Sequence, residues 1–390
     1  MFLLLFFFNF ATAQPSVVGG SPATAGEWPD AVAILDSSGT IFCSGTLISE
    51  TLVLSAGHCT GRAETMVIDS HDLDQNTGVT RGITRTWQYA DHLNTLDVAV
   101  FELDSPVLVT PRQLALACLA DNYITTDATV DIVGYGATDV DGMDFPNALI
   151  HASAPLTDDT CSTPNMDCNE AVSPWGEMIA GGNGVDSCVG DSGGPLYLET
   201  PHGTFLAGIT SRGVKPATTS CGDGGIYVRS EAAVDWVETE TGQSLSRPDC
   251  ESLGLNQRPR PADVTITLDQ QVQTVQLLPN DPDSTQTHTY TIETAPVYGT
   301  ISVDGDGWVQ YTATENEPFS DTIVIRITDD GTPPLYGDAT LRVSLSQPKF
   351  EDPGGFACTA VARPFGFYGL WLGIGGFLCH HRRRIRSKRD

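Results

Sequence analysis

Short apolar runs separated by Gly, Asp and Ser residues occupy the chain from position 17 to about 245. The clearest runs are Ala31–Leu35, Thr51–Leu54, Val98–Leu103, Val130–Val133 and Phe205–Ile209. Many short strands with turn residues between them are typical of a β-barrel or a β-sandwich. The pattern changes at Ser230–Thr241, where Val234, Trp236 and Val237 recur at helical spacing. This spacing predicts an amphipathic helix that closes the domain.

A second set of strand-like runs follows a Pro-rich segment. Arg-Pro-Arg-Pro-Ala at 258–262 is typical of a stiff linker. The runs beyond it are Val264–Leu268, Thr289–Ile292, Thr300–Val303, Ile323–Thr328 and Leu341–Leu345. With turns such as Asp329-Asp-Gly between them, they predict a small antiparallel β-sandwich. Its Asp clusters fit calcium binding and simple turn formation about equally well.

Both ends of the chain are strongly apolar. Phe2–Phe8 is an apolar run and Ala11-Thr12-Ala13 is a small-residue cleavage pattern, so we expect a signal peptide over 1–13. A buried N-terminal helix is the alternative. Pro364–Cys379 is apolar and Gly-rich, shorter than the roughly 20 residues of a membrane span, and is followed by an Arg-rich tail. The tail favours membrane insertion over a buried core helix.

Composition narrows the class of protein. The 390 residues carry 49 acidic and 20 basic side chains, for a net charge of −29. Such a chain should repel nucleic acid and anionic lipid and attract cationic substrates. The length favours two or three domains. The chain has 10 cysteines and no Cys-x-x-Cys metal pattern, which indicates disulfides in an oxidising compartment.

Three motifs carry candidate chemistry, in the order His, Asp, Ser. They are Leu54-Ser-Ala-Gly-His-Cys59, Thr95-Leu-Asp-Val-Ala-Val-Phe101 and Asp186-Ser-Cys-Val-Gly-Asp-Ser-Gly-Gly-Pro195. A weakly acidic hydroxyl becomes a nucleophile only beside a base, and an imidazole titrates near neutral pH. A His, a buried Asp and a Ser among glycines are therefore the residue types that acyl transfer needs.

On these motifs, residues 17 to about 245 resemble the chymotrypsin/trypsin family of serine proteases. The resemblance implies an all-β fold of two six-stranded β-barrels with a C-terminal helix, followed here by the small sandwich and the apolar segment. It implies that His58, Asp97 and Ser192 form a catalytic triad. It also implies that the backbone N–H groups of Gly190 and Ser192 bind the oxyanion.

The resemblance extends to the primary substrate pocket. Asp186, six residues before the nucleophile, matches the carboxylate that binds Lys or Arg in trypsin-like members. A solvated loop carboxylate is the alternative. The other matching pocket residues are Ser187, Ser211, Gly213 and Gly225, of which Ser211 matches the residue that hydrogen-bonds the triad Asp.

Two departures bear on that pocket. Arg212 replaces an aromatic residue beside it, and Lys215 follows nearby. If either cation reached Asp186, basic substrates would be repelled.

Activation in the family implies a further ion pair. The mature N-terminus should be Val17, with its freed amine paired to Asp191. The preceding residues 14–16, Gln-Pro-Ser, would form a short propeptide that lacks a basic cleavage residue. We therefore expect trimming by a different peptidase.

The resemblance also suggests how the cysteines pair. Cys43–Cys59 and Cys188–Cys221 match family bridges, and Val130 with Leu198 replaces another bridge by a hydrophobic pair. The remaining expected pairs are Cys161–Cys168, which are close in sequence, and Cys118–Cys250.

The C-terminal part resembles bacterial modules. Residues 263–347 are similar to immunoglobulin-like or cadherin-like repeats, and the tail is similar to sorting signals cleaved by a membrane protease. The expected division is signal peptide 1–13, propeptide 14–16, protease domain 17–250, linker 251–262, sandwich 263–347 and linker plus sorting or transmembrane segment 348–390.

The sequence therefore predicts a bacterial serine endopeptidase, secreted or on the cell surface, that cuts after Lys or Arg. We expect a monomer without metal or organic cofactor and without a nucleic-acid partner. Its partners would be peptide substrates, a sorting protease acting on the tail, and the inner membrane, transiently or permanently. An inactive protease-like adhesion protein is the alternative.

Overall fold

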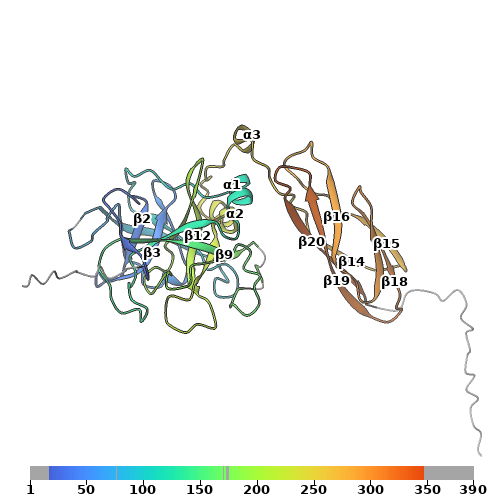
Figure 1. The fold of residues 1–390 in the computed structure, drawn as a ribbon, viewed down its shortest axis with the longest axis horizontal. Coiled ribbons are helices and arrows are strands. Elements are labelled where there is room, and N and C mark those ends of the chain that lie inside the picture. The colour runs from blue at the N-terminus through green and yellow to red at the C-terminus, as the bar shows by residue number, and fades with distance from the viewer. Residues whose placement is uncertain (1–16, 76, 170, 173–174, 347–390) are drawn as a thin grey trace, which may run out of the picture. The chain divides into compact units, whose positions relative to one another are not determined.

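The computed structural model describes residues 17–346, except 76, 170, 173 and 174 (Figure 1). It contains two compact units, of which the first runs to Arg258 and the second carries the strands that follow. The expected signal peptide 1–13, propeptide 14–16 and tail 348–390 lie outside the described residues. Among the described helices, none is long and apolar enough to cross a membrane.

The first barrel is closed by six antiparallel strands. They are β2 (Ala31–Leu35), β3 (Ile41–Leu47), β4 (Leu52–Ser55), β5 (Thr65–Ile68), β6 (Val79–Gln88) and β7 (Ala99–Leu103). Apolar side chains such as Val32, Ile34, Val53 and Phe101 fill its interior. Strand β4 pairs antiparallel with β7, so the residues after β4 and before β7 come to the same end of the barrel.

The second barrel closes in the order β9-β10-β13-β12-β11-β8, since β8 also pairs with β9. Its strands are β8 (Thr129–Gly134), β9 (Ile150–Asp158), β10 (Glu177–Ala180), β11 (Pro195–Thr200), β12 (Gly203–Gly213) and β13 (Gly225–Arg229), with β1 (Ser21–Pro22) added at the edge of β9. Val130 and Leu198 lie opposite each other in register and are buried. They form the hydrophobic pair that the sequence indicated.

Helical segments are few in the described chain. Helix α2 (Ser230–Thr241) has the bounds that its periodicity predicted, and Gly242 ends it in the left-handed conformation. The others are the short helices η1 (Gly57–Cys59), α1 (Cys118–Tyr123) and α3 (Cys250–Leu253). The sequence analysis did not predict these three helices, because helices of three to six residues are too short to show a helical period.

The segment 251–262, expected to be a stiff linker, is partly held by the first unit. Helix α3 extends into it to Leu253, and Arg258 is buried. Asp121 accepts the Arg258 backbone N–H at 3.0 Å and forms an ion pair with its guanidinium. The Arg-Pro repeat therefore begins with a residue anchored in the first unit.

The second unit consists of a four-stranded and a three-stranded sheet. The first has the order β14 (Val264–Thr267), β20 (Tyr336–Leu345), β19 (Phe319–Asp329), β16 (His288–Thr294), and the second the order β15 (Val272–Gln276), β18 (Trp308–Ala313), β17 (Gly299–Val303). Strand β14 pairs parallel with β20, so the expectation of an all-antiparallel sandwich was wrong at this pair. The fold class itself, two six-stranded barrels with a closing helix and a small Ig-like β-module, is confirmed.

Candidate active site

His58 and Asp97 meet because of the pairing of β4 with β7. Ser55 at the end of β4 lies opposite Ala99 at the start of β7, which brings η1 next to the residues that precede β7. His58 Nδ1 lies 2.8 Å from Asp97 Oδ2. The His58 backbone N–H donates to Asp97 Oδ1 at 3.0 Å. Both carboxylate oxygens therefore hold one histidine in place.

Ser211 on β12 of the second barrel supplies a third bond to Asp97. Its hydroxyl donates to Asp97 Oδ2 at 2.7 Å. Burial opposes ionisation of Asp97, but the hydrogen bonds from His58 and Ser211 outweigh it and lower the pKa of Asp97. An ionised, fixed carboxylate can orient the imidazole and stabilise its protonated form.

Ser192 lies in the loop that precedes β11. Its carbonyl accepts the Ser44 N–H at 2.8 Å, and the next residue, Gly193, donates to Thr210 at 2.7 Å. The Cys59 sulfur, one residue after His58, lies 3.6 Å from the same carbonyl. The backbone of Ser192 is thus fixed beside the histidine turn.

The Ser192 hydroxyl makes no hydrogen bond to His58 or to any other described residue. Structures without substrate often show long contacts between nucleophile and base, which tighten when substrate binds. The structure therefore brings together His58, Asp97 and Ser211 by direct hydrogen bonds, and Ser192 by its backbone.

The backbone N–H groups of Gly190 and of Ser192 itself have no acceptor among the described residues. Within the described chain, neither Gly190 nor Ser192 donates its backbone N–H to a protein group, although Asp191, Gly193 and Gly194 all do. Gly190 has a φ of 96°, which favours glycine. Two free donors beside a candidate nucleophile are the arrangement that binds a developing oxyanion.

Asp186 lines a cavity of about 250 Å³ together with Gly213 and Gly224. It is 2% exposed. Its Oδ2 accepts the N–H groups of Gly222 at 2.8 Å and Gly224 at 3.1 Å, whereas its buried Oδ1 has no hydrogen-bond partner in the described structure. Burial raises the pKa of Asp186. The cavity therefore contains a carboxylate oxygen without a partner.

The other expected pocket residues differ in position. Gly213 lines the cavity, but the neighbouring Gly224 does so in place of Gly225, and Ser187 is also absent from its lining. A Cβ on Gly225 would come 2.9 Å from the Ser187 hydroxyl, so these two residues pack against each other. Ser211 lies in the groove beside His58, a cavity of about 490 Å³.

Neither nearby cation is bound to Asp186. Arg212 Nη1 and Nη2 bind the two carboxylate oxygens of Glu177 at 2.7 and 2.9 Å. Lys215 Nζ lies 2.8 Å from Asp167 Oδ2. Both cations line the cavity that holds Asp186, but each is paired with a carboxylate that does not line it.

Asp191 is buried beside two backbone donors. Gly136 and Cys188 each donate an N–H to it at 2.8 Å. Burial raises the pKa of Asp191 to about 7. Val17 is also fully buried, but no hydrogen bond joins it to Asp191 in the described chain. In the full-length chain its nitrogen is an uncharged amide, because Ser16 precedes it.

Comparison with known proteins identifies the first unit. Residues 17–237 match the family model described as trypsin. The chain belongs to the trypsin family. Residues 256–343 match the model described as a bacterial Ig domain, so this is a trypsin-like serine protease with a C-terminal bacterial Ig domain.

Two matching proteins illustrate the relationship. A protein called trypsin from Saccharopolyspora erythraea is 34% identical over 236 residues, which is 56% of this chain and 95% of that protein. The solved structure of neuropsin, a serine protease expressed in the limbic system of mouse brain, is 23% identical, covers 57% of this chain and 98% of its own, and has a TM-score of 0.48.

Disulfides brace the trypsin-like unit around the site. The described structure forms Cys43–Cys59, Cys118–Cys250, Cys161–Cys168 and Cys188–Cys221, which are the expected pairs. The first fixes η1 with His58, and the last flanks the cavity that holds Asp186. Among the described residues, the one cluster with metal-ligand spacing is Cys43, His58 and Cys59. Its two sulfurs are already joined to each other, so it does not fit a metal.

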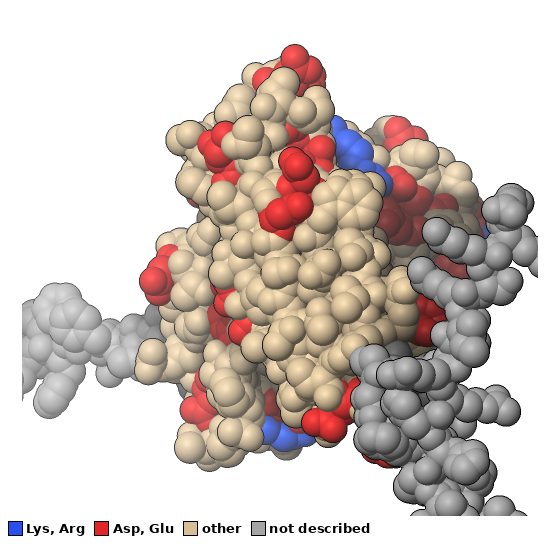
Figure 2. Space-filling view, turned by 90° about the vertical axis from the view of Figure 1, so that its right-hand side faces the viewer, with Lys and Arg blue, Asp and Glu red and all other residues tan. Residues whose placement is uncertain are grey.

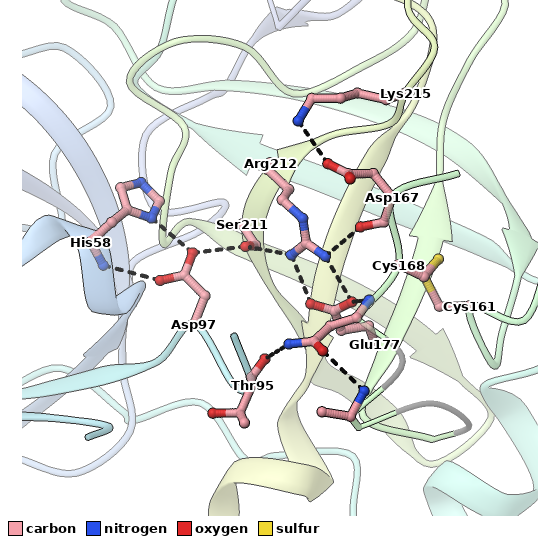
Figure 3. Close-up of polar contacts among 12 residues, drawn as sticks. His58, Thr95, Asp97, Cys161, Asp167, Cys168, Glu177, Ser211, Arg212 and Lys215 are labelled. Atoms are coloured by element: carbon pink, nitrogen blue, oxygen red, sulfur yellow. Dashed lines mark hydrogen bonds and ion pairs between the residues drawn. A yellow bond between two sulfur atoms is a disulfide. The ribbon is translucent and has the colours of Figure 1, made fainter. Parts of the chain in front are cut away.

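Sequence reasoning missed Glu177 and Asp167, the two residues that bind Arg212 beside Ser211. Figure 3 shows Glu177 and Asp167 around the Arg212 guanidinium, and Arg212 next to Ser211. The signal available was a glutamate at the start of an otherwise apolar strand, in a chain where Arg212 already needed a partner. A buried Glu in a strand is rare unless it is paired.

Proposed function

We propose that this trypsin-like protease is an endopeptidase that cleaves peptide bonds after Lys or Arg. The observation that carries the proposal is the unpartnered, buried Oδ1 of Asp186 in a cavity bordered by glycines. A buried carboxylate oxygen without a donor needs a cation, and a Lys or Arg side chain of a substrate supplies one. The pairing of Arg212 with Glu177 and of Lys215 with Asp167 leaves that place open.

The proposed mechanism assigns a role to each residue of the site. His58 accepts the proton of the Ser192 hydroxyl as that oxygen attacks the carbonyl carbon, and returns it to the leaving amine. Asp97 holds the imidazole through Nδ1 and stabilises its charge. The N–H groups of Gly190 and Ser192 stabilise the negative oxygen of the tetrahedral intermediate. Water then hydrolyses the acyl-enzyme by the same steps.

Activation forms part of the same proposal. The freed amine of Val17 would supply the positive charge that the buried Asp191 lacks in the full-length chain. Charge pairing of a buried carboxylate lowers its pKa and stabilises the loop that carries it. Because Gly190, Ser192 and Asp191 share that loop, processing and formation of the oxyanion site would be coupled.

The protease would act outside the cytoplasm, on the cell surface or free. This part of the proposal rests on the apolar N-terminus, the cysteine content and the C-terminal sequence. The net charge of −29 fits the choice of cationic substrates, and on the one face shown in Figure 2 Asp and Glu side chains appear in more places than Lys and Arg. A strongly negative protein attracts basic polypeptides, and the attraction weakens with salt.

The test is cleavage of a matched set of peptides by protein whose N-terminus has been sequenced. The peptides differ only in the residue before the cut bond, which is Arg, Lys, Phe or Ala. We expect cleavage of the Arg and Lys peptides and none by the Ser192→Ala variant. Preferential cleavage after Phe or Ala would overturn the specificity, and activity retained by Ser192→Ala would overturn the mechanism.

A further inference from the structure

Arg212 and Glu177 form a bidentate ion pair next to the catalytic carboxylate. Glu177 is fully buried at the start of β10, and the Arg212 side chain on β12 is 31% exposed. Arg212 Nη2 also donates to the Asp167 carbonyl at 2.8 Å. A guanidinium presents its donors in a rigid fork, so these partners fix the direction of every N–H that remains.

One of those N–H groups points at the triad. Arg212 Nη1 donates to Ser211 Oγ at 3.2 Å, and Ser211 Oγ lies 2.7 Å from Asp97 Oδ2 (Figure 3). A hydroxyl has a single proton, and an arginine can only donate. Ser211 must therefore accept from Arg212 and direct its proton to Asp97. The nearby cation also polarises the hydroxyl and strengthens that second bond.

Glu177 supports the same carboxylate by a second route. Its Oε2 accepts the Asn169 N–H at 2.8 Å, and the Asn169 side chain donates to the Thr95 carbonyl at 2.8 Å. Thr95 lies two residues before Asp97, in the segment that enters β7. The ion pair thus holds Asp97 from the second barrel both through Ser211 and through the Thr95 backbone.

We propose that Arg212 is a positioning residue for catalysis, which with Glu177 fixes Ser211 as a donor to Asp97 and so orients His58. This inference rests on the proposed function, because it assumes that Asp97 and His58 act in peptide hydrolysis. It gives a positioning role to the arginine that replaces an aromatic residue of the family.

The charged groups around Asp97 determine in which direction the pH dependence of kcat/KM should shift when the ion pair is removed. The groove also holds His58, His92, Asp167 and Lys215. Lys215 and Asp167 pair with each other, and Gln88 contacts His92 at 3.3 Å. Arg212 is the member of the ion pair that contacts Ser211, which binds Asp97. Removing the pair takes a positive charge from beside that hydroxyl, so the acid limb of the kcat/KM profile should shift to higher pH.

The experiment removes both charges at once, so that no buried carboxylate is left unpaired. The variant is Arg212→Met with Glu177→Gln, and the matched control is Arg247→Met with Glu238→Gln, a two-bonded ion pair between α2 and the segment that follows it. Both are assayed as processed protein with a single-residue arginine ester. Arg212 also lines the cavity that holds Asp186, so kcat, which reports positioning, and KM, which reports substrate binding, are determined separately. Arg212→Lys is measured as well, because a lysine keeps the charge but cannot make all these bonds at once.

We expect kcat for the ester to fall about tenfold with KM within about twofold, the effect of losing one charge-assisted hydrogen bond to the catalytic carboxylate. The acid limb should move up by about half a pH unit. The kcat of Arg212→Lys should lie between those of the parent enzyme and the double variant. The kcat of the control variant should equal that of the parent enzyme. In a Ser211→Ala background, removing the pair should lower kcat by clearly less than in the parent, because the route through Ser211 is already broken and only the route through Thr95 remains.

Unchanged ester kinetics, or a change confined to longer peptides, would mean that Arg212 only lines the substrate groove and would overturn the inference. If removal of the ion pair lowered kcat equally in the parent and in the Ser211→Ala background, the inference would be overturned too. The proposed function fails in a different way, namely when the parent protein, processed to start at Val17, does not hydrolyse the ester at all.

Discussion

Replacing Asp186 by Asn tests the primary pocket, because activity and stability should change in opposite directions. The carboxylate is buried, two backbone N–H groups satisfy Oδ2, and Oδ1 has no partner. An arginine substrate that pairs with Oδ1 forms a desolvated ion pair, and losing one member of such a pair costs about 3–5 kcal/mol. The kcat/KM for arginine substrates should then fall by about 10²- to 10⁴-fold.

Stability should move the other way at neutral pH. Burial raises the folded-state pKa of Asp186 above its unfolded value, so its charge destabilises the folded protein wherever the carboxylate is ionised. That cost is absent below the unfolded pKa, grows as pH rises from there, and is fully present above the folded-state pKa. Asp186→Asn should therefore unfold at a higher temperature than the parent at pH 8, and the difference should vanish near pH 3.

The assay is steady-state cleavage of Arg and Ala peptides together with thermal unfolding across pH. Asp223→Asn is the matched control, because Asp223 lines the same cavity but is only partly buried, and Thr218 and Thr219 already donate hydrogen bonds to it. Its loss should change kcat/KM by less than about tenfold, since a partly solvated carboxylate with its own donors contributes little to binding a substrate cation. A fall below tenfold for Asp186→Asn, or equal effects of the two variants, would refute the reasoning.

Three further changes have defined outcomes. Arg112→Met leaves Asp30, which is 1% exposed, without its cation, so the free energy of unfolding should fall by about 3–5 kcal/mol in a urea titration; a loss below 1 kcal/mol would contradict this. Gly193→Ala adds a Cβ at a φ of 78° that overlaps the end of β4, so kcat/KM should fall at least about 100-fold; activity within threefold of the parent would count against it. Burial raises the pKa of Asp191 to about 7 in the full-length chain, so protein processed to Val17 should unfold at a higher temperature at pH 8, and the gap should close as pH falls to about 4; a gap independent of pH would exclude the ion pair.

The local pattern of the chain was sufficient for much of the fold. Strand β2 and helix α2 have the bounds that a short apolar run and helical spacing predicted, because such patterns are set by neighbouring residues in the chain. Strands β15 and β18 of the second unit were missed, since their polar and apolar residues alternate around Gln and Thr without a strong apolar run. The parallel pairing of β14 with β20 joins residues about 77 positions apart, and no local pattern encodes a partner at that distance.

The candidate site shows the same division. By itself, the sequence determined which side chains could do the chemistry, because His58, Asp97, Ser192 and Asp186 stand in short motifs whose residue types the reaction requires. Only the tertiary structure decided what holds them, including the Glu177 carboxylate that binds the Arg212 guanidinium and leaves one of its N–H groups on Ser211. The physical reason is range. Propensity and motif chemistry act between neighbours in the chain, whereas hydrogen bonds, ion pairs and burial act between neighbours in space, and folding alone makes those neighbours.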